Sequence, residues 1–329
     1  MIWSGVPVIV TGAGGFIGSH LVEALVGQGA RVRAFVRYTS RGEIGLLRWL
    51  PKTVLQAVEV QRGDVRDGAA ILHAMEGCDV VFHLAALVSI PYSYQHPREV
   101  VETNLLGTLN VLEAARRAQP RCVVHTSTSE VYGTAQTIPI TEQHPLQAQS
   151  PYAASKVGAD QLAESYHRCF GVPVTTVRPF NTYGPRQSAR AVIPTIIMQA
   201  LANDQIRLGS LHPTRDFTFV RDTVEGFLLA AATSEAVGHD VNLGSDQEIA
   251  IGDLAHKILV LSGRSVPIVT EERRVRPTAS EVGRLHADNA LAQRLLGWRP
   301  TVSLEDGLRQ TMVWIREHLD LYRVEEYAI

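Results

Sequence analysis

The sequence predicts an α/β fold with a doubly wound parallel sheet, followed by a smaller mixed α/β substrate-binding domain. Three observations predict it. β-branched apolar runs alternate with amphipathic stretches, and a glycine-rich turn joins the first run to the first helix. After about Gly184, prolines and short mixed segments replace this alternation. A chain of 329 residues is long enough for about two domains. We expect the first domain over residues 1–184, completed by parts of 216–245, and the second over 185–329.

Strands and helices are expected to alternate along the first domain. The apolar runs predict buried parallel strands over 6–11, 32–36, 79–84, 122–126 and 172–177, with a further strand ending before Asp64. Apolar residues recur at helical spacing over 16–25, 100–118 and 152–170. In the second domain we expect strands over 206–208, 217–220, 241–243 and 266–269, and helices over 192–203, 223–234, 251–262, 288–296 and 304–318. The last ten residues are expected to form a loosely held tail.

Composition excludes several classes of function. The chain has 31 basic and 33 acidic residues, a net charge of −2, so we expect no nucleic-acid partner. No positive charge precedes Arg31, as a secretory signal would need, and the uncharged run 80–97 is too polar to span a bilayer. Cys78, Cys122 and Cys169 form no CxxC pair, and the 12 histidines form no HxH or HExxH cluster. We therefore expect a cytoplasmic protein with no membrane partner and no metal.

A glycine-rich turn, Thr-Gly-Ala-Gly-Gly-Phe-Ile-Gly over 11–18, follows the first strand and opens the first helix. Its glycines stand in the spacing GxxGxxG, which brings backbone N–H groups to a pyrophosphate at the positive end of the helix. The strand before and the helix after distinguish a Rossmann dinucleotide site from an ordinary turn. We predict that the cofactor contacts Gly12, Gly14, Gly15, Phe16, Ile17 and Gly18.

The end of the second strand bears on which dinucleotide is bound. An acidic residue there would bind a free ribose 2′-hydroxyl, but the chain has Arg37 and, four residues on, Arg41. Arginine pairs with a 2′-phosphate, so NADP is favoured over NAD, the alternative being that both arginines are solvated surface residues. Asp64 and Val65, after the third strand, are candidates to contact the adenine ring.

Tyr152 and Lys156 stand four residues apart near the start of a predicted helix, so their side chains share one face. Tyrosine, with a pKa of about 10, is a poor base at neutral pH, and a cation within about 4–6 Å lowers such a pKa. We expect Lys156 and a positive nicotinamide ring to make Tyr152 a general base. The polar run 125–133 ends a strand and is expected to face the same crevice as the glycine turn.

Several motifs occur in one order along nearly the whole chain. They are the glycine turn, His-Leu-Ala-Ala over 83–86, Asn104, Thr-Ser-Thr-Ser-Glu-Val-Tyr-Gly over 126–133, Ser-Pro-Tyr-Ala-Ala-Ser-Lys over 150–156, and Arg-Pro-Phe-Asn-Thr-Tyr-Gly-Pro-Arg over 178–186. In these motifs the chain resembles the extended short-chain dehydrogenase/reductase family. The resemblance implies NAD(P)-dependent chemistry on nucleotide-activated sugars, with a nucleotide-diphosphate sugar as substrate and a homodimer as the assembly.

The triplet Thr128-Ser129-Glu130 bears on the subgroup. It resembles the triplet of GDP-mannose 4,6-dehydratases, and it differs from the dTDP-glucose enzymes, which have Asp where Ser129 stands. That difference leaves the general acid for loss of the 6-hydroxyl open. UDP-glucuronate decarboxylases share the triplet, and 4-epimerases are a further alternative. The stretches 188–195 and 208–217 look most like N-acetylglucosamine-nucleotide 4,6-dehydratases of legionaminic-acid-type pathways.

The resemblance implies a role for each candidate residue. Tyr152, assisted by Thr128, removes the proton of the sugar 4-hydroxyl, and Glu130 removes the C5 proton before the 6-hydroxyl leaves. Cofactor contacts are also implied for Leu84, Ala85, Ala86 and Phe180. Substrate contacts are implied for Ser89, Asn181, Val192, Arg215, Arg276 and Glu281. A non-catalytic dinucleotide sensor is the remote alternative, since such a protein has no reason to keep Thr128, Glu130, Tyr152 and Lys156 together.

Overall fold

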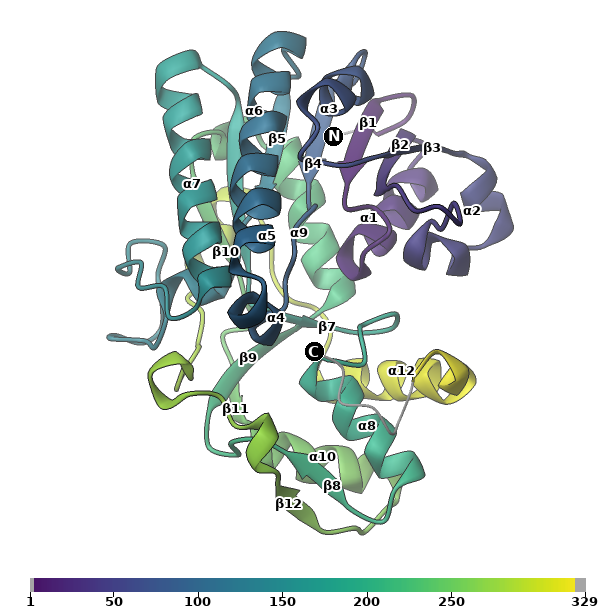
Figure 1. Ribbon diagram of the computed structural model, residues 1–329, viewed down its shortest axis with the longest axis vertical. Coiled ribbons are helices and arrows are strands. Elements are labelled where there is room, and N and C mark those ends of the chain that lie inside the picture. The colour runs from purple at the N-terminus through teal and green to yellow at the C-terminus, as the bar shows by residue number, and fades with distance from the viewer. Residues whose placement is uncertain (1–2, 323–329) are drawn as a thin grey trace.

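The computed structural model describes residues 3–322 and has a larger part built on one sheet and a smaller part beneath it (Figure 1). The larger part holds a seven-stranded sheet in the order β3-β2-β1-β4-β5-β6-β10, in which every pair is parallel. This confirms the predicted doubly wound α/β fold. Its strands are β1 (Pro7–Thr11), β2 (Arg31–Arg37), β3 (Val58–Gly63), β4 (Val80–His83), β5 (Cys122–Thr126), β6 (Val174–Pro179) and β10 (Asp240–Leu243).

Both faces of this sheet are covered by helices. Residues alternate between faces along each strand, so Val8 and Val10 pack in one apolar cluster while Ile9 packs in another. The first cluster includes residues of α1 (Phe16–Gly27) and α9 (Val220–Ala232). The second includes residues of α3 (Gly68–Met75), α6 (Gly107–Ala118) and α7 (Pro151–Phe170).

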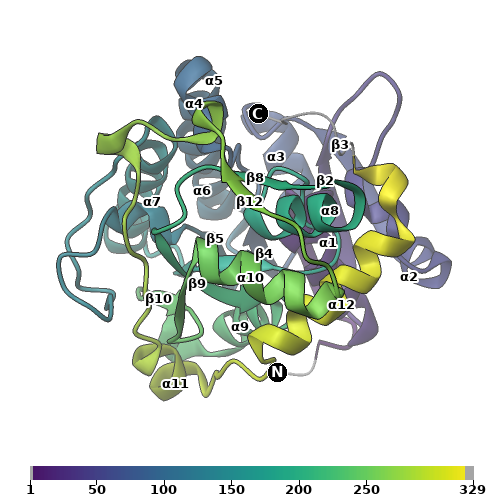
Figure 2. The same cartoon turned by 90° about the horizontal axis from the view of Figure 1, so that it is seen from below.

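The smaller part is mixed α/β, as predicted, and Figure 2 shows it from below. Its three-stranded sheet has the order β11-β9-β7, with β11 antiparallel and β7 parallel to β9, and a second sheet pairs β12 with β8. The strands are β7 (Asn181–Tyr183), β8 (Ile206–Leu208), β9 (Thr214–Phe219), β11 (Glu248–Ala250) and β12 (Ile268–Thr270). The helices that follow Gly184, besides α9, are α8 (Val192–Ala202), α10 (Ile251–Ser262), α11 (Ala290–Leu296) and α12 (Leu304–Glu317).

Chain order does not follow the division into two parts. Strand β10 comes late in the sequence yet pairs with β6 at the edge of the large sheet, and α9 covers one face of that sheet. Both lie within the stretch 216–245. The exact domain bounds 1–184 and 185–329 stay a prediction.

Several element bounds differ from the sequence expectation. The strand expected over 217–220 runs from Thr214 to Phe219, and α9 begins at the next residue, because Val220 has helical neighbours rather than a ladder partner. The helix expected over 100–118 is three consecutive pieces, α5 (Pro97–Val101), a π-turn over Glu102–Leu106, and α6. The short elements α2 (Lys52–Gln56), α4 (Ile90–Gln95), β7 and β11 have too few residues to show a period. The expected tail lies largely outside the described residues.

The fold creates a crevice at the carboxyl ends of the parallel strands. Strand β1 has β2 on one side and β4 on the other. Successive strands are therefore added first toward one edge of the sheet and then toward the other, and α/β sheets bind ligands at this switch point. Between residues 3 and 322, no helix is both long and apolar enough to cross a membrane.

Candidate active site

One cavity of about 870 Å³ lies at the carboxyl edge of the sheet and reaches residues of the smaller part. It is lined by residues at the ends of β1, β2, β4, β5 and β6 and by residues around α8 and β9. Of the residues predicted from the sequence, the cavity is lined by Gly12, Gly14, Gly15, Phe16, Ile17, Gly18, Arg37, Asp64, Val65, Leu84, Ala85, Ala86, Ser89, Thr128, Ser129, Glu130, Tyr152, Phe180, Asn181, Val192, Arg215, Arg276 and Glu281. Arg41 and Lys156 do not line it.

The glycine turn is built so that only glycine fits. Gly12 has φ +69°, and a Cβ there would lie 2.7 Å from the backbone N of Ala85. A Cβ on Gly18 would overlap the carbonyl oxygen of Gly12. That oxygen accepts a hydrogen bond from the N–H of Gly15 at 2.9 Å. Gly15 is the N-cap of α1 and has no capping side chain. The first backbone N–H groups of the helix therefore remain available to a pyrophosphate, so this cradle fits a dinucleotide.

A loop that sequence reasoning missed packs on this turn. Leu46 N donates to Gly14 O at 2.9 Å, and a Cβ on Gly14 would lie 2.9 Å from Ile44 O. The loop thereby brings Thr39, Glu43, Ile44 and Gly45 to the cavity. Arg41 is exposed and lies outside the lining, so its cofactor contact stays a prediction.

Arg37, Asp64 and Arg66, which line the cavity near the ends of β2 and β3, each have an opposite charge beside them. Arg37 is largely exposed, and its Nη2 lies 3.6 Å from Oε1 of Glu99. Asp64 accepts from Arg66 at 2.6 Å, and this hydrogen bond lowers the pKa of the Asp64 carboxyl. A ligand at this end thus meets two ion pairs and no isolated charge among the lining residues Arg37, Asp64 and Arg66.

Tyr152 lies in the first turn of α7, which Ser150 caps by accepting from Ala153 N at 3.1 Å. The ring is 6% exposed and lines the cavity. Burial raises the pKa of Tyr152, while a hydrogen bond with Thr128 lowers it. The causes that act on this pKa in the protein without cofactor do not include Lys156, so the expected joint effect of Lys156 and a nicotinamide ring stays a prediction.

Lys156 lies behind the cavity wall, one turn further along α7. It is 3% exposed, and its Nζ donates to the backbone carbonyl of Thr126 at 2.6 Å. Burial lowers the pKa of Lys156 to about 8, while the Asp160 carboxylate raises it. Lys156 therefore lies beneath the cavity wall, at the end of β5.

A buried charge network under Lys156 was missed by sequence reasoning. Asp160 accepts from Ser127 Oγ at 2.7 Å and from Arg178 Nη2 at 3.1 Å, and His125 Nε2 lies 3.1 Å from its other oxygen. Although burial acts to raise the pKa of Asp160, the hydrogen bond with His125 and the charges of Arg178 and Lys156 lower it. The signal was present in the sequence, since residues 152, 156 and 160 repeat at helical spacing on one face.

The opposite wall brings together three residues predicted to contact substrate. Arg215 Nη2 donates to Glu281 Oε1 at 3.2 Å, and Arg276 Nη1 lies 3.8 Å from the same oxygen. Burial lowers the pKa of Arg215, and the carboxylates of Glu130 and Glu281 counter this. The Asn181 Nδ2 atom is buried and has no hydrogen-bond partner among the residues described, so it is available to a ligand.

Ser89 has a structural partner. Ser89 caps α4 by accepting from Tyr92 N at 3.2 Å. The part of the chain that the structure describes contains no group of three or more His, Cys, Asp or Glu side chains placed to hold a metal ion.

A glycine cradle, a tyrosine and lysine on one buried helix, and an arginine-bearing wall define an enzyme of the short-chain dehydrogenase/reductase class, in its epimerase and dehydratase group. The chain belongs to the GDP-mannose 4,6 dehydratase family, whose model matches residues 9–311.

Relatives in this family carry out three different reactions. The chain is 33% identical to a dTDP-glucose 4,6-dehydratase of Actinoplanes sp., over 94% of this chain and 97% of that protein. It is 33% identical to a UDP-glucose 4-epimerase of Mycolicibacterium smegmatis, over 94% and 98% respectively. It is 32% identical to UDP-glucuronic acid decarboxylase 1 of Xenopus tropicalis, over 97% and 74%. Identity alone therefore does not choose among the reactions.

Solved structures agree with the fold over nearly the full length. A dTDP-glucose 4,6-dehydratase double mutant from Streptomyces venezuelae, with NAD bound, superposes with a TM-score of 0.85 at 30% identity, covering 96% of this chain and 99% of that one. A UDP-glucuronic acid 4-epimerase from Bacillus cereus, in complex with a fluorinated UDP-glucuronic acid and NAD, gives a TM-score of 0.87 at 28% identity, covering 95% and 99%.

Replacing Asp160 by Asn is expected to destabilise the protein by about 3 kcal/mol, because Arg178, 2% exposed, would lose its buried counter-charge and keep only Asp240, which is 40% exposed. Urea unfolding followed by circular dichroism measures the effect. The control is Glu305→Gln, which removes an exposed partner of Arg309 and should change stability by less than about 1 kcal/mol. Equal shifts for the two variants would contradict the structural role of the buried pair.

Lys156 is expected to lose its proton near pH 8, because burial disfavours its charged form. It is a cation below that pH and neutral above it, whereas an ordinary lysine stays charged to about pH 10.4. The chain has three lysines, so ¹³C-lysine labelling gives a simple NMR spectrum in which one resonance should titrate near pH 8. Lys156→Met should delete that resonance and Lys257→Met should leave it. A spectrum in which no signal moves below pH 9.5 would refute the assignment.

Proposed function

We propose that the protein is a nucleotide-sugar 4,6-dehydratase, which converts a UDP- or GDP-linked hexose to its 4-keto-6-deoxy form. The observation that carries the proposal is the position of Glu130. It lies in the cavity two residues after Thr128, on the short 3-10 turn Ser129–Tyr132, and its backbone N–H donates to Thr128 Oγ1 at 3.3 Å. Glu130, Thr128 and Tyr152 line the same cavity, and the Glu130 charge acts to raise the pKa of Tyr152. A dTDP-glucose 4,6-dehydratase is among the relatives, beside a 4-epimerase and a decarboxylase of similar identity.

In the proposed mechanism, Tyr152 accepts the proton of the sugar 4-hydroxyl. The Thr128 side chain orients this sugar hydroxyl toward Tyr152. Burial raises the pKa of Tyr152, so the phenolate must be stabilised when substrate is bound, and the Lys156 cation behind the wall contributes to this. A bound nicotinamide supplies hydride acceptance from C4 and hydride return to C6. The glycine cradle, Val65 and Phe180 are proposed to hold that cofactor.

Glu130 is proposed to remove the C5 proton once C4 is a ketone, because the ketone acidifies the neighbouring C–H bond. The same carboxyl, then protonated, is proposed to protonate the departing 6-hydroxyl, which leaves as water, and the proton that C5 needs when hydride returns to C6 is taken from solvent. Ser129 is 3% exposed and carries no acidic group, so it does not replace the aspartate that the dTDP-glucose enzymes have there. We assign both proton transfers to Glu130.

On the substrate side, Arg215 and Arg276 are proposed to bind the diphosphate and Asn181 the sugar-phosphate linkage. Both arginines lie beside the Glu281 carboxylate. Glu281 is proposed to accept a hydrogen bond from a hydroxyl of the nucleotide ribose. Val192 is proposed to flank the nucleotide base, and Ser89 the sugar. The stretches 188–195 and 208–217 support N-acetylglucosamine as the hexose, as in the legionaminic-acid-type group. The alternatives are a 4-epimerase, which needs no base at Glu130, and a UDP-glucuronate decarboxylase, which shares the Thr-Ser-Glu triplet.

A homodimer is proposed through α6 and α7, which lie side by side (Figure 1). Exposed apolar side chains support this assembly. Leu106, just before α6, is 46% exposed, and Phe170, the last residue of α7, is 54% exposed.

Incubation with UDP- and GDP-N-acetylglucosamine and with dTDP-glucose is expected to give loss of one water from at least one of them by mass spectrometry. Glu130→Gln should abolish that loss while C4 oxidation continues, so reduced-nicotinamide absorbance should accumulate on the enzyme. Glu142→Gln, a carboxylate outside the cavity that accepts from Asn242 N, is the matched control and should dehydrate normally.

Other products would replace the proposal. A product of unchanged mass and altered C4 configuration would establish an epimerase, and carbon dioxide release from UDP-glucuronate would establish a decarboxylase. Full-rate dehydration by Glu130→Gln would remove this residue as the base.

NADP is expected to stabilise the cofactor-free protein against heat more than NAD does, because the exposed Arg37 can exchange its partner Glu99 for a 2′-phosphate. Arg37→Gln should remove the advantage of NADP. Arg41→Gln is the control, since Arg41 does not line the cavity. A larger shift with NAD, unaffected by Arg37→Gln, would assign NAD as the cofactor.

A further inference from the structure

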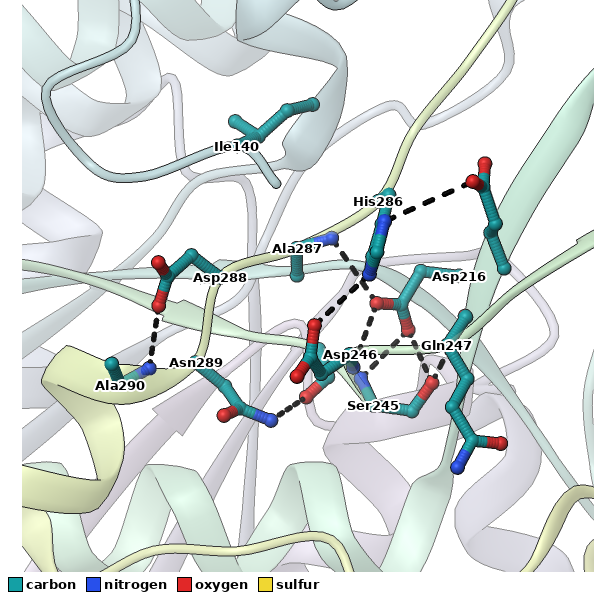
Figure 3. Close-up of polar contacts among 12 residues, drawn as sticks. Ile140, Asp216, Ser245, Asp246, Gln247, His286, Ala287, Asp288, Asn289 and Ala290 are labelled. Atoms are coloured by element: carbon teal, nitrogen blue, oxygen red, sulfur yellow. Dashed lines mark hydrogen bonds and ion pairs between the residues drawn. The ribbon is translucent and has the colours of Figure 1, made fainter. Parts of the chain in front are cut away.

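Adjacent residues of β9 face opposite sides of the strand. Arg215 lines the cavity, whereas Asp216 has no exposed surface and does not line it, as alternation along a strand requires. Figure 3 shows Asp216 at the centre of a polar cluster formed with the loop that carries Ser245 and Asp246 and with the segment that carries His286 and Ala287.

The Asp216 carboxylate is saturated by donors from these two segments. Its Oδ1 accepts from Ser245 N and from Ser245 Oγ, both at 2.7 Å (Figure 3). Its Oδ2 accepts from Asp246 N at 3.0 Å and from Ala287 N at 3.2 Å. An ionised carboxylate accepts hydrogen bonds and donates none, so four donors suit this form. Burial raises the pKa of Asp216, and the hydrogen bonds from Ser245 and Ala287 act against that rise.

The loop backbone is shaped to fit this carboxylate. Asp246 adopts φ +58°, and the consecutive N–H groups of Ser245 and Asp246 each donate to one oxygen of the Asp216 carboxylate. Gly244 precedes them, and a Cβ there would overlap the Cβ of Ala287 and lie 3.0 Å from Asp216 Oδ2. The close approach of the loop to the segment 284–287 therefore requires glycine at 244.

The segment held by Asp216 is the one that carries substrate-wall residues. Thr214 N donates to Gly283 O at 3.1 Å, and Leu285 N donates to Thr214 O at 3.2 Å, so the segment runs beside β9. Ala287 N then bonds to Asp216, which fixes how far the segment is shifted along the strand. Glu281, two residues before Gly283, thereby reaches Arg215.

An outer ring of charges closes the cluster. Glu248 of β11 pairs with Arg284 and accepts from Thr214 Oγ1 at 2.6 Å. His286 Nε2 lies 2.9 Å from Asp246 Oδ1, and His286 Nδ1 lies 3.8 Å from Glu248 Oε1. These contacts join the same three segments, and all of them are more exposed than the Asp216 contacts.

We propose that Asp216 is a positioning residue, which fixes the alignment of β9 with the segment 281–287 so that Arg215 and Glu281 meet at the nucleotide-diphosphate end of the cavity. This inference rests on the proposed function, because it takes the ligand of Arg215 to be a nucleoside diphosphate. Asp216 touches no ligand and acts through Arg215.

The test is calorimetric binding of UDP, dTDP and GDP to the full chain, which needs no turnover. Asp216→Asn places an amide N–H₂ among N–H donors, and Kd for the nucleotide that wild-type protein binds best should rise about tenfold, the scale of one charge-assisted hydrogen bond. In turnover assays KM for the sugar nucleotide should rise while kcat stays within about twofold, because the chemistry at Tyr152 and Glu130 is untouched. Ser245→Ala removes one of the four donors and should give a smaller rise in Kd.

Two comparisons separate positioning from general destabilisation. Asp222 of α9 is also buried and accepts from Thr301 N, Thr301 Oγ1 and Val302 N, yet it does not line the cavity or contact β9 residues by hydrogen bonds. Asp222→Asn should therefore lower thermal stability without changing Kd. Asp216→Asn combined with Arg215→Gln should bind no more weakly than Arg215→Gln alone, because the first change acts through the lost arginine.

The outcomes for the two proposals differ. Unchanged Kd in Asp216→Asn and Ser245→Ala, equal weakening by Asp222→Asn, or additive weakening in the double variant would each overturn the positioning role. Nucleotide binding by wild-type protein without loss of water from any sugar nucleotide would overturn the dehydratase and leave the positioning role standing. Failure of wild-type protein to bind any of the three nucleotides would overturn both.

Discussion

The buried ion pair between Asp160 and Arg178 is the interaction on which the site depends. It joins α7, which carries Tyr152 and Lys156, to β6, and through His125 and Ser127 it reaches β5 and the turn that follows. Both charges are 2% exposed, so neither can exchange its partner for water without a large cost. The spacing between α7 and the end of β5 is therefore fixed by charge as well as by apolar packing.

Two further buried carboxylates, Asp216 and Asp222, accept hydrogen bonds from N–H and hydroxyl groups and so join segments that are distant in the sequence. Asp216 joins β9 to the segment near residue 287, and Asp222 joins α9 to residues 301 and 302. Each accepts at least three hydrogen bonds, which is what an ionised group needs once water is removed. Apolar contacts give the two parts their cohesion, and these carboxylates set the alignment of particular elements.

The sequence allowed the doubly wound sheet, the glycine cradle and the Tyr152 face of α7 to be predicted, because each follows from local periodicity or spacing. Strands β7 and β11 could not be predicted, since three residues show no period and their pairing depends on β9. The position of Arg41 depends on a loop whose path is set by the contact between Gly14 and Ile44, far apart in sequence. Lys156 was correctly placed on the Tyr152 face, but its depth behind the wall follows from Asp160.

The near-neutral net charge of −2 has a local counterpart in the cavity. Arg37 faces Glu99, Arg66 faces Asp64, and Arg215 and Arg276 share Glu281. Under the proposed function, a diphosphate that enters the cavity takes the place of a carboxylate beside an arginine. These arginines therefore have an anionic partner both before and after the ligand binds. Arg215 lies near two carboxylates, Glu281 and Glu130, and both act against the fall in its pKa that burial causes.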